Sequence, residues 1–149
     1  MTTRSQAAIA LFNLVSTITW GEGQAFVTKD RRLRHFSKVS RDEQPAIFQG
    51  EHNETIGQIT RMPSKVIMDL SLVIYHQASL DPSVIGADYN SAIIEAILFA
   101  LAPLPGTGDR QSLGGIVHHC WVEGSIFKEP GDDETHQGML VIPVRIMLP

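Results

Sequence analysis

Apolar and polar side chains alternate most regularly from Ser64 to Ala78, which predicts a long β-strand there. The two expected faces are an apolar one of Val66, Met68, Leu70, Leu72 and Ile74, and a polar one that includes Lys65, Asp69, Ser71 and Gln77. Because only one face is apolar, the pattern favours an antiparallel sheet with a single covered face.

Helical periodicity appears twice. A first helix is expected from about Arg4 to Thr17, with Thr3 as N-cap, Gln6 three residues later, and an apolar stripe of Ala8, Ile9, Phe12 and Val15. A second helix should start with Asp81 as N-cap and Pro82 in its first turn, and should end near Leu101 before Pro103. Its wide apolar face, suited to lying on a sheet, comprises Ile93, Ile94, Ile97, Leu98 and Leu101.

The remaining strands are shorter or less regular. Residues 45–51 read as a short strand and residues 54–63 as a weak strand or loop, whereas residues 116–128 and 139–148 read as a β-hairpin with a long loop. The last run places five apolar side chains on one face (Leu140, Ile142, Val144, Ile146 and Leu148). Pro143 cannot donate a backbone hydrogen bond, so this run is expected at a sheet edge or at a bulge. Residues 104–115 are expected to form a flexible connector.

These elements predict an α+β fold of one domain spanning residues 1–149, with two helices against a mostly antiparallel sheet. The single cysteine rules out an internal disulfide framework and fits a reducing compartment. The first 20 residues do not resemble a signal peptide. The most apolar run, residues 92–102, is interrupted by Glu95 and is far shorter than the about 20 residues of a membrane span. We therefore expect a soluble, cytoplasmic protein without a membrane partner.

The charge is unevenly distributed along the chain. The net charge is −4, yet residues 29–41 hold six of the twelve Lys and Arg residues, while acids gather in residues 129–134. The basic segment has three readings: binding of nucleic acid through phosphates, contact with an acidic protein surface, or a solvated loop without a partner. Phe36 is its only aromatic residue, and no recognised DNA- or RNA-binding module surrounds it.

The most conspicuous chemical cluster is His118, His119 and Cys120. In a strand, His118 and Cys120 would share a face and His119 would point away, so a zinc site would need further ligands such as Glu123 or His136. The favoured reading is a structural strand with locally bonded histidines and a buried cysteine. We therefore predict no metal and no cofactor.

Other catalytic signatures are missing. No P-loop ending, GxSxG elbow or HExxH motif occurs, and Asp132, Asp133 and Glu134 lack the spacing of a calcium loop. Asp69 lies on the polar face of the long strand without an identifiable partner. The sequence predicts no catalytic residues and no enzyme.

Several features favour self-association. The predicted strand at residues 64–78 is long, and small sheets with long strands expose edges that must be covered. The second face of the final segment is also apolar, through Met139, Val141 and Met147. We predict an assembly interface formed by these three residues together with the basic side chains of Arg31, Arg32 and Arg34.

The C-terminal segment resembles a known family. Residues 112–149, SLGGIVHHCWVEGSIFKEPGDDETHQGMLVIPVRIMLP, are similar to the closing segment of tail terminators (tail completion proteins) of long-tailed bacteriophages and prophages. The similar features are an LGG-x-VHHC-x-x-EG opening, a PGD turn, a QG pair and an LV-x-P-V-x-I ending. Residues 44–49, the PSK that opens the long strand, and residues 81–101 look similar too, so the similar segments together make up slightly less than half of the chain.

The resemblance implies a subunit of a hexameric ring on the head-proximal end of the tail tube. Such a ring stops tube polymerisation and offers a docking surface to the filled head, and DNA passes through its lumen at ejection. The implied partners are further copies of the chain, the tail tube protein and a head–tail connector or stopper protein. The implied location is the virion tail, after assembly in the host cytoplasm. A head–tail connector or another minor tail component is the first alternative, followed by a nucleic-acid-binding module and a zinc enzyme.

Overall fold

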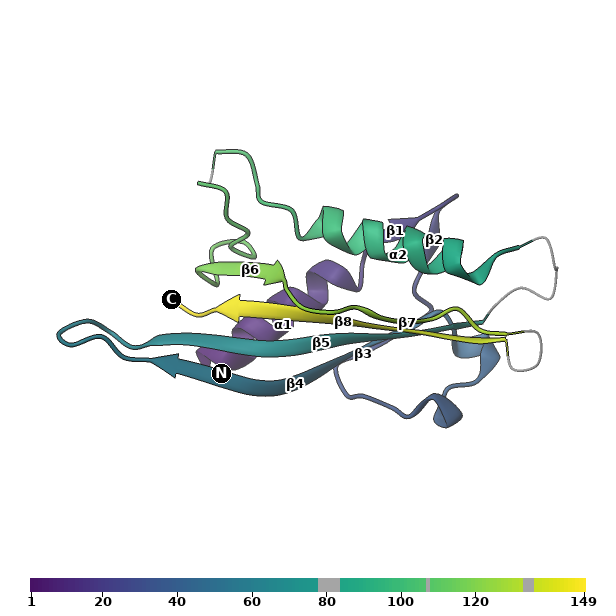
Figure 1. The fold of residues 1–149 in the computed structure, drawn as a ribbon, viewed down its shortest axis with the longest axis horizontal. Coiled ribbons are helices and arrows are strands. Elements are labelled where there is room, and N and C mark those ends of the chain that lie inside the picture. Colours follow the sequence, from purple (N-terminus) through teal and green to yellow (C-terminus); the bar gives the residue numbers. More distant parts are fainter. Residues whose placement is uncertain (78–83, 107, 133–135) are drawn as a thin grey trace.

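The computed structural model describes residues 1–77, 84–106, 108–132 and 136–149. It contains two α-helices, α1 (Thr3–Val15) and α2 (Gly86–Ala100), and two short 3₁₀ helices, η1 (Phe36–Lys38) and η2 (Arg41–Glu43). The strands are β1 (Thr19–Trp20), β2 (Gln24–Ala25), β3 (Thr28–Asp30), β4 (Ala46–Gly57), β5 (Lys65–Gln77), β6 (His119–Val122), β7 (Phe127–Glu129) and β8 (Gln137–Met147). Figure 1 shows both helices against one elongated sheet.

The main sheet has the order β3-β4-β5-β8-β6, and β7 also pairs with β8. The β3–β4 pair is parallel and the other pairs are antiparallel, while β1 and β2 form a separate small ribbon. This arrangement confirms the predicted α+β class, with two helices on a mostly antiparallel sheet.

The main core lies between the helices and one face of the sheet. The helices contribute Ala7, Ala8, Leu11, Phe12 and Val15 from α1 and Ile93 and Ile97 from α2. The sheet contributes alternate residues of its two long central strands: Met68, Leu70, Leu72 and Ile74 from β5, and Leu140, Ile142, Val144 and Ile146 from β8. The apolar faces predicted for residues 64–78 and 139–148 are therefore the core-facing ones.

The expectation of a single covered face is wrong for part of the sheet. A second cluster of Val39, Ala46, Phe48, Val73 and Tyr75 lies on the opposite face, with Met139 and Val141 packed against it. The cause is the segment between β3 and β4, which carries η1 and η2 and folds over this end of the sheet (Figure 1). We call the sheet face that the helices leave uncovered the open face.

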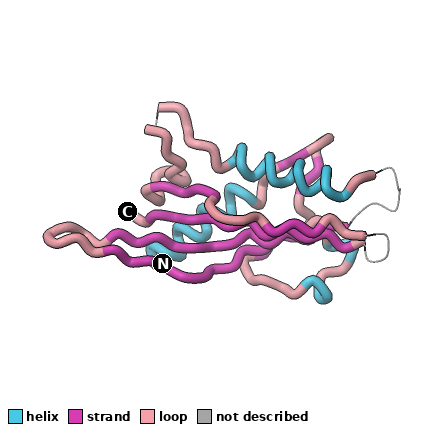
Figure 2. The backbone as a smooth tube through the Cα atoms, in the orientation of Figure 1, coloured by secondary structure: helices cyan, strands magenta, loops and turns pink. Residues whose placement is uncertain are grey.

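β4 is one strand of 12 residues where the sequence predicted a short strand and a weak one. Its pairing with β5 is irregular only between Glu51 and Glu54, which is the point where the predicted segments are divided. β4 and β5 then continue past the core as a projecting hairpin, which Figure 2 shows as two strands joined by a loop. We call residues 55–65 of this hairpin the arm.

The predicted hairpin of residues 116–128 and 139–148 is confirmed, but its last strand is not at an edge. β8 lies between β5 on one side and β6 and β7 on the other. Pro143 is accommodated because the pairing on that second side is interrupted: β6 ends with Val122 opposite Val144, and β7 begins with Phe127 opposite Val141. The partner strand is broken at the position where a missing N–H would otherwise disrupt the ladder.

The helix boundaries differ from the prediction at the N-termini. Thr2, not Thr3, caps α1, since its side chain accepts a hydrogen bond from the backbone N–H of Ser5 at 3.1 Å. The predicted start of the second helix at Asp81 and Pro82 lies outside the described residues, and α2 begins at Gly86 without a side-chain cap.

The end of the second helix near Leu101 is confirmed. Its buried stripe, Ile93, Ile97 and Leu101, is narrower than predicted, because Leu98 is 45% exposed. No helix within the described parts of the chain is long and apolar enough to span a membrane.

The segment expected as a flexible connector is anchored to the core. Gln111 is buried, and its side-chain amide donates to the carbonyl oxygens of Ala100 and Ala102 while its Oε1 accepts from the N–H of Leu113. These bonds satisfy carbonyls at the end of α2, which explains why a glutamine is buried here.

Candidate assembly surface

The three arginines predicted at an interface differ in their surroundings. Arg34 is held by its own subunit: its Nη1 lies 3.1 Å from Glu43 Oε2, its guanidinium stacks 5.2 Å above the Phe48 ring, and its carbonyl accepts a hydrogen bond from Tyr75. Arg31 lies 3.9 Å from Glu51 at the limit of an ion pair. Arg32 is exposed, so it is the one whose side chain is best placed to meet a partner.

The three apolar residues predicted at the interface are divided between two places. Met139 and Val141 are half-buried on the open face and belong to the same cluster that Arg34 covers through Phe48. Met147 lies toward the other end of β8, opposite His119 of β6 and Ile67 of β5. The structure therefore brings Arg34, Met139 and Val141 together and leaves Met147 apart.

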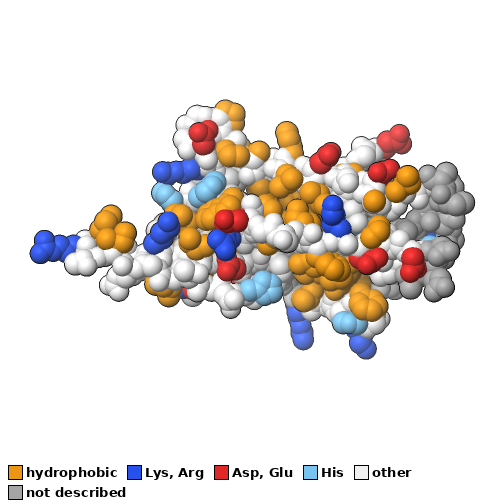
Figure 3. All heavy atoms as spheres, viewed as in Figure 1, with side chains coloured by type: hydrophobic (Ala, Val, Ile, Leu, Met, Phe, Trp, Pro, Cys, Tyr) orange, Lys and Arg blue, Asp and Glu red, His pale blue; other side chains and the backbone are white. Residues whose placement is uncertain are grey.

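A hollow on the open face adjoins this cluster. Its volume is about 240 Å³, and it is lined by Phe36, Glu129, Gln137 and Met139. Phe127 lies beside it on the same face because it pairs with Val141 and is 55% exposed. Figure 3 shows hydrophobic side chains gathered on this part of the surface, with acidic side chains next to them. We call the four lining residues the open-face hollow.

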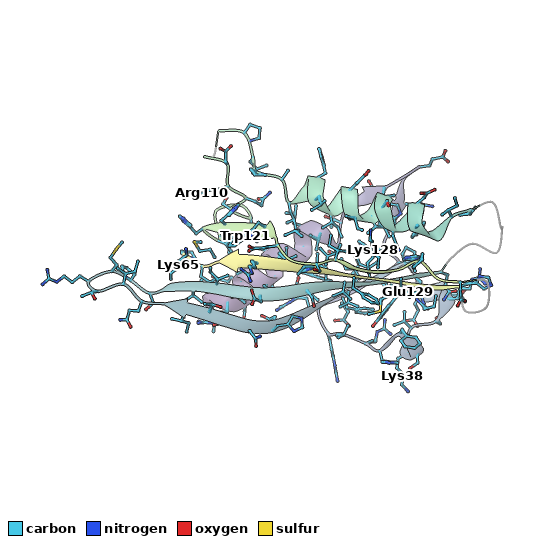
Figure 4. All side chains as sticks on the ribbon, in the orientation of Figure 1. Lys38, Lys65, Arg110, Trp121, Lys128 and Glu129 are labelled. Carbon is cyan, nitrogen blue, oxygen red and sulfur yellow. The ribbon has the colours of Figure 1, made fainter. Side chains whose placement is uncertain are left out.

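The polar groups of the hollow differ in how free they are. Gln137 is fully engaged: its amide donates to Gln44 and to the carbonyl oxygen of His76, and its Oε1 accepts from Gln44 and Gln77. Glu129 is exposed at the end of β7, and Figure 4 shows it at the end of the sheet away from the arm. The carboxylate of Glu129 is thus the charged group that the hollow offers to a partner.

The middle of the open face carries a polar network. Arg145 Nε lies 3.2 Å from Asp69 Oδ1, and its Nη1 lies 2.9 Å from Glu123 Oε2, which also accepts from the Trp121 indole at 2.9 Å. The sequence identified no partner for Asp69, and the fold supplies one, because β5 and β8 are neighbours and place Asp69 directly opposite Arg145. Each ionised group already has an opposite charge beside it, so the network cross-links β5, β8 and β6 and contains no free nucleophile or base.

The His118, His119 and Cys120 cluster is dispersed. Cys120 is fully buried, and burial raises the pKa of its thiol to about 12. His119 accepts a hydrogen bond from the N–H of Gln111 and stacks on Trp121, whereas His118 is exposed. The expectation that His118 and Cys120 share a face is wrong because β6 begins at His119, so strand alternation does not extend to His118.

The other side chains considered as metal ligands do not form a metal site either. No group of three or more His, Cys, Asp or Glu side chains with a metal-binding arrangement occurs among the residues that the structure describes. Asp133 and Glu134, for which the sequence disfavoured a calcium site, lie outside the described residues.

A second concavity lies on the helix side. It has a volume of about 410 Å³ and is lined mainly by apolar side chains of α1 and of the segment after α2, including Leu14, Leu104 and Ile116. Among the described lining residues the one polar side chain is Gln111, whose amide and carbonyl are bonded to the backbone as described above. The wall therefore offers no free polar group of the kind that orients a small ligand.

The arm is the feature that sequence reasoning missed. Ile56, Ile59 and Met62 are each at least 60% exposed there, although they are large and apolar. The sequence did contain a sign of an exposed apolar surface, since three apolar side chains occur in a stretch that was interpreted as a weak strand or loop. The length of the projection depends on the pairing with β5, which no local pattern gives.

Neither a comparison with protein-family models nor a search of curated proteins finds a match to this chain.

Proposed function

We propose that this chain is a structural subunit of a bacteriophage tail, a tail terminator that assembles into a ring. The resemblance to tail terminators implies that the ring is a hexamer. In this role the ring caps the head-proximal end of the tail tube, stops its polymerisation and presents a docking surface to the head. Its partners are further copies of the chain, the tail tube protein and the head–tail connector, and DNA only passes through its lumen.

One observation carries the assembly part of the proposal. Five of the large apolar side chains that remain exposed lie at the two ends of the sheet, Ile56, Ile59 and Met62 on the arm and Phe36 and Phe127 at or beside the open-face hollow; others, such as Leu98 and Phe99, lie on α2. Concentrated exposed apolar surface is typical of protein–protein contacts. The other two parts of the proposal, the location in a phage tail and the ring-shaped assembly, rest on the resemblance of residues 112–149 to tail terminators.

The alternative of a nucleic-acid-binding module is less well supported. Arg31 and Arg34 of the basic segment already face Glu51 and Glu43, which reduces the positive charge available for phosphates. A zinc enzyme is disfavoured by the buried thiol of Cys120 and the separate environments of His118 and His119. A head–tail connector or another minor tail component fits the same surfaces and is separated from a terminator by the partner it binds.

The test is the mass of the purified protein in solution, measured by light scattering behind a sizing column over a range of concentrations and salt levels. We expect a hexamer, or a monomer that becomes one when the tail tube protein of the same phage is added. A strict monomer in the presence of that tube protein would overturn the proposal. Assembly with a portal or connector protein but not with the tube protein would instead favour the alternative that this chain is a head–tail connector.

A matched pair of variants tests the basic segment. Arg32→Ala removes an exposed side chain and should impair assembly while leaving the thermal unfolding temperature unchanged. Arg41→Ala, also exposed, is the control and should assemble normally. DNA binding that falls steeply with salt and disappears in Arg32→Ala would instead favour the nucleic-acid reading.

A further inference from the structure

The arm exposes side chains that a subunit on its own would be expected to bury. Ile56 and Ile59 are each 62% exposed and Met62 is 60% exposed. Removing large aliphatic side chains from water is favourable, so three such residues together favour docking against another surface. A partner surface for the arm should therefore be apolar and concave.

The arm is also positively charged. Residues 55–68 contain Arg61 and Lys65 and no acidic residue. The open-face hollow is apolar through Phe36 and Met139 and carries the carboxylate of Glu129. Within the described residues neither Arg61 nor Glu129 forms an ion pair, so the charges of arm and hollow are complementary and available.

Two lysines near the hollow do not cancel this complementarity. Lys128 alternates with Phe127 and Glu129 along β7, so its side chain lies on the opposite face of the sheet. Lys38 follows Phe36 in η1, and Figure 4 shows its side chain extending outward from the sheet.

The arm cannot fill the hollow of its own subunit. Figure 1 shows the arm projecting from one end of the elongated sheet, whereas β7, which carries Glu129, lies toward the other end. Two complementary surfaces at opposite ends of one subunit produce head-to-tail contacts, which close into a ring or extend as a filament.

We propose that the arm of one copy seats in the open-face hollow of the next copy, with Ile59 and Met62 against Phe36 and Met139 and with Arg61 facing Glu129. This inference rests on the self-association in the proposed function and names the surfaces that produce it. The hollow, at about 240 Å³, is smaller than the roughly 300–1,000 Å³ of small-molecule sites, and its size suits one or two side chains.

Disulfide trapping between copies tests the contact directly. Ile59→Cys and Phe36→Cys are prepared as separate proteins, one of them carrying a size tag, mixed in equal amounts and oxidised mildly. We expect the mixed, tag-shifted dimer to be the main product. The native Cys120 does not interfere, because it is fully buried.

The control uses a cysteine on the helix side of the molecule. Phe99→Cys places a thiol on α2 at a position that is 85% exposed, away from the open face, and should give little mixed dimer with Ile59→Cys. Predominant Ile59→Cys homodimers would indicate arm-to-arm pairing, and predominant linkage to Phe99→Cys would indicate another docking site. Either result overturns the proposal.

A charge exchange gives a second, independent measurement. Arg61→Glu should weaken self-association about two- to fivefold, as expected for an exposed ion pair, and Glu129→Arg added to the same chain should restore it. Both positions are exposed, so neither change should alter the thermal unfolding temperature.

The outcomes separate this inference from the proposed function. Rings that form normally with Arg61→Glu and without trapping between Ile59→Cys and Phe36→Cys would refute the arm contact and leave the terminator proposal standing. A wild-type chain that stays monomeric even with the tube protein would refute both.

Discussion

The imidazole of His76 is 1% exposed in the core between β5 and α2. It is hydrogen-bonded to Asn90 and packs against the Tyr89 ring at a tilt, and the backbone of Gly138 approaches so closely that a Cβ at that position would collide with the imidazole. Burial lowers the pKa of His76 from its ordinary value of 6.5, with the bond to Asn90 opposing the shift. Tyr89 is neutral in the pH range of interest, and burial raises the pKa of its hydroxyl further above the ordinary value.

This environment predicts an acid-sensitive stability. Below pH 6.5 the unfolded state takes up a proton on His76 that the folded state resists, so the free energy of unfolding should decrease as the pH falls through 6.5 toward the lowered pKa. The limiting slope for one proton is about 1.4 kcal/mol per pH unit. Urea unfolding between pH 8 and 5 measures it.

Variants isolate the contribution of His76. His76→Gln should be less stable at pH 8 but should show a shallower pH dependence than the wild type, whereas the exposed His118→Gln should follow the wild-type curve. Parallel curves for the wild type and His76→Gln would contradict the assignment.

Among the elements, the N-terminus of α1 offers a direct test of a boundary that sequence placed one residue too late. Thr2→Ala removes the side-chain acceptor for the N–H of Ser5 and should reduce the free energy of unfolding by about 1 kcal/mol, within a usual range of about 0.5–2 kcal/mol. Thr3→Ala is the control: Thr3 is already helical and exposed, and alanine has the higher helix propensity, so no loss is expected. Denaturant unfolding of both variants distinguishes them, and a larger loss for Thr3→Ala would be the contrary result.

At the scale of the whole molecule, the two faces of the sheet should contribute unequally to stability. Ile142 is fully buried under the helices, so Ile142→Ala should cost about 2–5 kcal/mol. Ile67 is half-buried on the open face, and Ile67→Ala should cost clearly less. Equilibrium unfolding of the isolated subunit compares the two, and equal losses would contradict a two-layer subunit with an uncovered face.

The sequence alone determined the class of the fold and the core-facing side chains of the long strands. The reason is that hydrophobic periodicity is local: the alternation in residues 64–78 and 139–148 sets which side chains face the helices whatever the neighbouring strands are. The end of α2 before Pro103 followed for the same reason, because a proline blocks the helix through its own backbone.

The tertiary structure decided everything that depends on which strands are neighbours. Only the pairing of β5 with β8 places Asp69 opposite Arg145, and only the break between β6 and β7 allows Pro143 in a central strand. The folding of the basic segment over Phe48 covers part of the second face and engages Arg34.

The candidate assembly surface also has a part that the sequence predicted and a part that only the tertiary structure shows. Met139 and Val141 could be chosen from the sequence because alternation marks both faces of the last strand as apolar. The hollow beside them could not, because Phe36, Glu129 and Met139 come from three separate segments. The arm depends on how far β4 and β5 remain paired beyond the core, and such long-range pairing leaves no periodic mark in either strand alone.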